Sequence, residues 1–72
     1  MDVDARGLKC PLPIVRLTKA SKQASLGDKI RIQADDPAFE PDVRAWCRKT
    51  GNALVGLTNE GGVTVVVIRK ET

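Results

Sequence analysis

The residues of this chain that could do chemistry are its two cysteines, Cys10 and Cys47, in a sequence of 72 residues that contains no histidine. A deprotonated cysteine is a strong nucleophile and a metal ligand. Two cysteines without histidine are too few for a structural zinc site or a disulfide framework, and we expect no metal and no cofactor. The missing histidine also excludes Cys–His nucleophilic pairs and histidine general bases. Any chemistry is therefore predicted to be that of a thiol without a histidine partner.

Cys10 stands directly before two prolines spaced by one residue, Pro11 and Pro13. Proline has a helix-compatible φ and no N–H, so it is accepted in the first turn of a helix and rarely later. The pattern predicts Cys10 as the N-cap and the two prolines as the first and third helical residues, because a residue before proline is extended, as an N-cap requires. Gly7 lets the chain turn before this segment. We therefore expect the thiol at the positive end of a helix, facing solvent.

The charged residues nearest to Cys10 in sequence are basic. Helix N-termini and nearby cations favour the thiolate, and Lys9 and Arg16 are the candidate cations. Pro11 and Pro13 remove two N–H groups that could have bonded the sulfur, so we expect only a modest activation. The alternative interpretation is that Cys10 is a small residue in a tight turn.

A second predicted helix carries apolar residues at helical spacing: Phe39, Val43, Trp46, Cys47 and Thr50. Buried cysteine often acts as a small hydrophobic residue, so we predict a packing role for Cys47. Both helices follow strands and should run roughly parallel, which offsets Cys10 from Cys47 by about 10–15 Å along the helix axes. A disulfide needs Cα atoms within about 7 Å, so we expect no internal disulfide.

Hydrophobic periodicity predicts the element order βαβαββ. The predicted strands are 3–6, 29–35, 53–58 and 63–69, the predicted helices are about 11–25 and from 39 or 40 to 50, and a hairpin turn is predicted at 59–62. Gly51 is a natural residue to end the second helix. The last strand is apolar at nearly every residue, as is typical of a central strand. These elements predict an α/β two-layer sandwich, a four-stranded mixed sheet with two helices on one face, in a single domain, 1–72.

Composition argues against several classes of protein. No apolar run approaches the roughly 20 residues of a membrane span. The acidic start at 1–4 lacks the order of a signal peptide, so we expect a cytoplasmic protein. The net charge of +3 is mild and aromatic residues make up only 3% of the chain, which argues against a stacking platform for single-stranded nucleic acid.

Basic residues lie around Cys10 and continue beyond it: Arg6, Lys9, Arg16, Lys19 and Lys22. They form either a solvated helix face or a docking surface for acidic partner proteins, and the sequence leaves both interpretations open. The acidic pair Asp35 and Asp36 precedes Pro37, an arrangement typical of a helix start. We interpret this pair as a helix cap rather than a metal site.

The pattern Asp4-x-x-Gly7-x-x-Cys10-Pro11-x-Pro13 resembles the signature of the TusA (SirA-like) sulfur-carrier family. The similarity covers almost the whole chain, through the segments 35–37, 46–47, 51 and 67–70. The resemblance implies that Cys10 accepts sulfane sulfur as a persulfide, with Gly7, Pro11 and Pro13 shaping its turn. It also implies a sulfurtransferase-type persulfide carrier rather than a classical turnover enzyme.

The resemblance further implies two kinds of partner. The sulfur donor would be a cysteine desulfurase or a rhodanese, and the acceptor a DsrE-like or TusD-like protein, in a sulfur relay for tRNA thiolation, cofactor thiolation or dissimilatory sulfur oxidation. We expect a monomer that binds neither membrane nor nucleic acid directly. The alternatives are a small thiol redox protein, disfavoured by the lack of a second cysteine within reach, and a regulatory or RNA-binding module, disfavoured by the mild charge and few aromatic residues.

Overall fold

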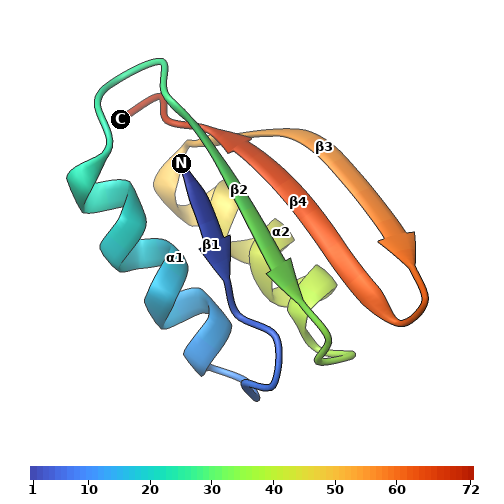
Figure 1. Cartoon of the computed structure of the whole chain (residues 1–72). Coiled ribbons are helices and arrows are strands. Elements are labelled where there is room, and N and C mark those ends of the chain that lie inside the picture. Colours follow the sequence, from blue (N-terminus) through green and yellow to red (C-terminus); the bar gives the residue numbers. More distant parts are fainter.

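The computed structural model describes all 72 residues and has the predicted order of elements (Figure 1). The elements are β1 (Asp2–Asp4), α1 (Leu12–Gln23), β2 (Lys29–Ala34), α2 (Phe39–Thr50), β3 (Ala53–Glu60) and β4 (Val63–Arg69). The predictions for α2 and β4 are confirmed. Gly51 ends α2 with a φ of 82°, a left-handed conformation that glycine adopts without steric cost.

β4 lies inside the sheet, whose strand order is β1-β2-β4-β3. β1 and β2 are parallel, and β4 is antiparallel to both β2 and β3, which confirms the mixed four-stranded sheet. Val66 and Ile68 of β4 are fully buried, whereas Val65 and Val67 on its other face are half-buried. The apolar residues of β4 therefore lie on both faces of the sheet: one set packs in the core under the helices, and the other lies on the face that no helix covers.

The hairpin between β3 and β4 is tighter than predicted. Glu60 pairs with Val63, so only Gly61 and Gly62 form the turn. Their φ values are 56° and 80°, and a two-residue hairpin turn of this kind needs positive φ at both positions. Gly61 and Gly62 supply both positive φ values, so the turn needs no further residues. β3 therefore continues through Asn59 to Glu60, beyond its predicted end.

α1 ends earlier than predicted, at Gln23. Ala24 is extended, and its N–H bonds to the carbonyl oxygens of Ala20 and Ser21. The Lys70 ammonium, from the segment after β4, donates hydrogen bonds to the carbonyl oxygens of Ser21 and Ala24. A cation suits the negative end of a helix, so Lys70 ties the end of α1 to the end of the sheet.

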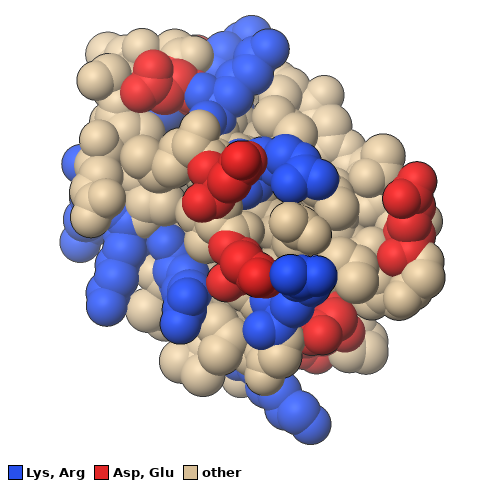
Figure 2. Space-filling model, in the orientation of Figure 1, with Lys and Arg blue, Asp and Glu red and all other residues tan.

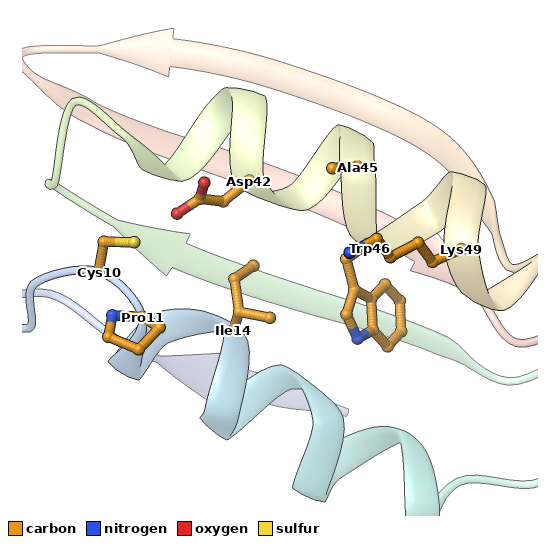
Figure 3. Close-up of a pocket in the computed structure, with 7 residues that line it drawn as sticks. All are labelled: Cys10, Pro11, Ile14, Asp42, Ala45, Trp46 and Lys49. Atoms are coloured by element: carbon orange, nitrogen blue, oxygen red, sulfur yellow. The ribbon is translucent and has the colours of Figure 1, made fainter.

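Both helices cover one face of the sheet, and the core lies between the two layers (Figure 1). Cys47 is buried in this core, as predicted. The helices lie side by side with their N-termini at the same end (Figures 1 and 3). Trp46 Nε1 of α2 donates a 3.1 Å hydrogen bond to Thr18 Oγ1 of α1, which satisfies the polar end of the largest side chain between the helices.

The parallel pairing of β1 and β2 positions the loops that follow them. The carboxyl ends of parallel strands lie at the same edge of a sheet. The loop at 5–11, which leads into α1, therefore lies beside the segment at 35–38, which leads into α2.

Neither helix has the length and apolar character required to cross a membrane.

Candidate functional site

Cys10 lies in a turn before α1 rather than at its N-cap. The carbonyl oxygen of Lys9 accepts the N–H of Leu12 at 2.8 Å, and this turn encloses Cys10 and Pro11, whose peptide bond is cis. The helix therefore begins at Leu12, with Pro11 as N-cap and Pro13 as the second helical residue. The prediction that Cys10 is the N-cap is wrong by one residue, because the turn holds it outside the helix. Its exposure to solvent is as predicted.

The acidic pair after β2 holds the Cys10 loop in place. Asp35 accepts the N–H of Gly7 at 3.0 and 3.2 Å, and Asp36 accepts the N–H of Cys10 at 2.6 Å. Gly7 has a φ of 81°, a left-handed conformation that a side chain would strain. Asp36 also accepts the N–H of Ala38 at 3.3 Å, but Ala38, not an aspartate, is the N-cap of α2. The helix-cap interpretation is therefore wrong for Asp35, which binds the Cys10 loop. Asp36 is not the N-cap either, but its hydrogen bond to Ala38 closes a turn just before the helix.

An open groove of about 250 Å³ runs between α1 and α2 beside the thiol (Figure 3). The residues on the α1 side are Cys10, Pro11 and Ile14, and those on the α2 side are Asp42, Ala45, Trp46 and Lys49. Figure 3 shows the Asp42 carboxylate facing the Cys10 sulfur at one end and Lys49 at the other. The groove thus has a thiol beside a negative charge at one end, a positive charge at the other end, and apolar residues between them.

The Asp42 carboxylate raises the pKa of the Cys10 thiol, first by accepting its hydrogen bond. Loss of hydration and the negative charges of Asp42 and Asp36 raise this pKa further. The expectation of a favoured thiolate is therefore wrong, because the groups that act on the sulfur are acidic. Arg16, one of the expected cations, instead directs its guanidinium to the carbonyl oxygen of Asp4 at 3.5 Å. These surroundings therefore favour the protonated form of the Cys10 thiol.

Four of the residues expected to form a basic docking surface, Arg6, Lys9, Arg16 and Lys19, lie in different environments. Arg6 forms an ion pair of 3.0 Å with Asp4, and its hydrogen bonds lower the pKa of that carboxyl to about 2. Arg16 and Lys19 line a second hollow, of about 430 Å³, between α1 and β1. Lys and Arg side chains gather along α1 in Figure 2. Lys9 is exposed, and none of these four residues lines the groove beside Cys10.

Sequence reasoning did not assign a site role to the α2 residues of the groove. Asp42, Trp46 and Lys49 recur at i, i+4 and i+7, the spacing of one side of a helix. That spacing was available in the sequence. Its meaning depends on two helices lying side by side with this side facing Cys10, which only the assembled fold provides.

Comparison with known proteins agrees with the fold. The family model described as Sulfurtransferase TusA matches residues 1–70. The sulfur carrier protein TusA of Allochromatium vinosum is 39% identical over 69 residues, covering 96% of this chain and 91% of that protein. A relative in Neisseria meningitidis is 40% identical, with 93% of this chain and 90% of the relative covered.

Two further comparisons concern length and fold. A relative in Aquifex aeolicus is 34% identical over 94% of this chain, and the chain spans only 34% of its length. A SirA-like protein from Desulfitobacterium hafniense, 23% identical, has a TM-score of 0.85 with 100% of both chains covered, and so shares the fold. With the family model matching nearly the whole sequence, the chain belongs to the TusA family of sulfur-carrier proteins.

Proposed function

We propose that Cys10 carries sulfane sulfur, as a persulfide, from a donor protein to an acceptor protein. The Cys10 thiolate attacks the outer sulfur of a donor persulfide, a new S–S bond forms to Cys10, and the donor leaves as a thiolate. An acceptor thiolate then attacks the outer sulfur on Cys10, and Cys10 leaves as a thiolate. Both steps are exchanges at an S–S bond, so no external oxidant or reductant is consumed.

The observation that carries this proposal is the accessibility of Cys10. A sulfur that passes between proteins must be reached by the sulfur of another protein, and Cys10 is the exposed thiol of the chain. Its loop is fixed by the carboxylates of Asp35 and Asp36, so the thiol has a defined position at the groove. A fixed loop lowers the ordering cost of each encounter with a partner.

The second cysteine supports a carrier over a redox protein. A protein that cycles between dithiol and disulfide needs two thiols that can meet. Cys47 lies in the core on α2, and both cysteines are free. We propose a cysteine desulfurase or a rhodanese as the sulfur donor and a DsrE-like protein as the acceptor. The cytoplasmic location and the monomeric state stay predictions.

Loading with a small-molecule sulfane-sulfur donor, followed by intact-mass spectrometry, tests the proposal. The wild type and Cys47→Ala should each gain one sulfur atom that a reductant removes. Cys10→Ser should gain none, because the remaining thiol is buried. Loading of Cys10→Ser to the level of the wild type would refute the role given to Cys10.

A further inference from the structure

The groove beside Cys10 carries two charged residues, Asp42 and Lys49, that form no ion pair within the chain. The ion pairs of the structure are Arg6–Asp4, Arg44–Glu40 and Arg69–Glu71, and none includes a groove residue. Asp42 forms no ion pair and faces the Cys10 thiol, and Lys49 at the other end is exposed and also unpaired. Both charges are therefore available to an incoming chain.

The floor of the groove between these charges is apolar. Pro11 and Ile14 form its α1 side, and Ala45 and Trp46 form its α2 side. Its volume of about 250 Å³ lies below the usual range for a drug-sized ligand, roughly 300–1,000 Å³. An open hollow of this size suits one or two side chains of a protein segment better than a whole small molecule.

The spacing of the two charges indicates the length of such a segment. Asp42 and Lys49 are seven residues apart on α2, which corresponds to about 10 Å along the helix axis. An extended chain advances about 3.3 Å per residue, so it crosses that distance in about three to four residues. A short extended segment can therefore place one side chain at each charge and an apolar side chain over the floor.

We propose that this groove receives an extended segment of the sulfur-exchanging partner, with a basic side chain beside its reacting cysteine at Asp42 and an acidic side chain at Lys49. This inference rests on the proposed function of Cys10 and specifies the chemistry of the partner. Charge complementarity fixes the direction of the segment, because the reversed segment would place like charges together at both ends.

Docking of such a segment would also change the state of the thiol. In the free chain Asp42 faces the Cys10 thiol, accepts its hydrogen bond and raises its pKa, which favours the protonated form. A cation paired with Asp42 offsets the negative charge that disfavours the thiolate. Cys10 then becomes nucleophilic where a partner sulfur is present, while the free protein keeps a less reactive thiol.

The test uses two pentapeptides of equal composition, Lys-Cys-Leu-Ser-Glu and its charge-swapped form Glu-Cys-Leu-Ser-Lys, each with blocked ends and its cysteine in a mixed disulfide with thionitrobenzoate. The Cys10 thiolate attacks the peptide sulfur, the S–S bond breaks, and the coloured aryl thiolate leaves, which gives a protein–peptide disulfide. The ratio of the two rates reports charge preference, because the intrinsic reactivity of Cys10 cancels. The first peptide should react about fivefold faster at low ionic strength, and added salt should reduce that ratio.

Two charge-swapped proteins provide the matched comparison. Asp42→Lys combined with Lys49→Asp should invert the preference between the peptides. Glu40→Arg combined with Arg44→Glu swaps an existing ion pair outside the groove on the same helix, and should leave the preference unchanged. A rate ratio near one in the wild type, or the same ratio in both swapped proteins, would overturn the proposed docking.

Sulfur loading of each protein from the small-molecule donor separates this inference from the proposed function. Normal loading together with a lost peptide preference would refute the groove alone. Failure of the wild type to load at Cys10 would refute the carrier function on which the groove proposal rests.

Discussion

A carboxylate from another helix, that of Asp42, raises the pKa of the Cys10 thiol. Asp42 faces the sulfur across the groove, and the charged residues that raise the pKa of Cys10 are Asp42 and Asp36. Because the thiolate is the form that reacts with oxidants and electrophiles, a thiol held protonated is protected in the free protein. Raising the pKa therefore suits a carrier that must react only when a partner has docked.

The carboxylate of Asp42 beside the thiol should determine how alkylation of Cys10 depends on pH. In wild-type protein, the midpoint of the rate against pH should lie above the ordinary thiol value of 9.0. Asp42→Asn removes the negative charge that disfavours the thiolate, so the midpoint should move to lower pH and the rate at neutral pH should rise. Stopped-flow or mass-spectrometric alkylation kinetics with a neutral reagent measure both.

Glu40→Gln removes one negative charge from the same helix outside the groove and serves as the control. It should leave the midpoint close to that of the wild type. Equal midpoints for Asp42→Asn and the wild type would show that Asp42 does not set the pKa of Cys10.

At the scale of elements, periodicity predicted β4 to the residue and α2 to within one residue at its start, since each depends on a regular apolar pattern within one segment. The start of α1 was predicted one residue too early. Two prolines fix a helix start only approximately, and Cys10 is held outside the helix by Asp36, an interaction across 26 residues. Contacts between segments distant in sequence leave no trace in local propensity.

Burial of Cys47 on α2 leads to a prediction about stability. Cys47 is 8% exposed and lies in the core cluster with Val43 and Trp46. Cys47→Ala should lower the free energy of unfolding by about 1 kcal/mol through lost packing, and Cys47→Ser by more, because a hydroxyl would be buried there. Urea unfolding followed by Trp46 fluorescence measures both changes.

Alkylation of the folded protein provides the check on that assignment. Cys47 should react far more slowly than Cys10, at a rate limited by opening of the structure. Modification of both cysteines at similar rates in native protein would contradict the burial of Cys47.

At the scale of the whole molecule, strand order decides where the site forms. The sequence predicted a mixed sheet but not the order β1-β2-β4-β3. With β1 and β2 adjacent and parallel, the segment at 35–36 meets the loop of Cys10, and α2 lies next to α1. The cysteine was therefore predictable from its motif, whereas Asp42 and Lys49 depend on a topology that one sequence pattern does not specify.

The molecule presents two surfaces on either side of α1, and they offer different contacts to a partner. One is the groove at Cys10, and the other is the hollow lined by Arg16 and Lys19 against β1. Between them, Leu12 and Val15 are 49% and 43% exposed. A partner that reaches Cys10 from the α1 side would pass over these apolar residues and approach the basic hollow.

This arrangement predicts electrostatic steering by the basic hollow. Transfer of sulfur from the loaded protein to a DsrE-like acceptor should slow as salt rises, because screening shortens the reach of surface charge. Arg16→Glu combined with Lys19→Glu should slow transfer much further. The same variant should remain folded and still load from a small-molecule donor, because Cys10 and its groove are unchanged. Single-turnover transfer, measured by intact mass of both proteins, gives the rates.

The matched variant for that experiment is Arg44→Glu combined with Arg48→Glu, which makes the same change in net charge on exposed residues of α2 outside the groove. If steering depends on the basic hollow, this variant should lose much less of the transfer rate than the change at Arg16 and Lys19. Equal losses in the two variants would mean that only net charge matters. Transfer indifferent to salt and to both variants would instead place docking on the exposed apolar turn of Leu12 and Val15, where association depends on burial of apolar surface, which salt screens little.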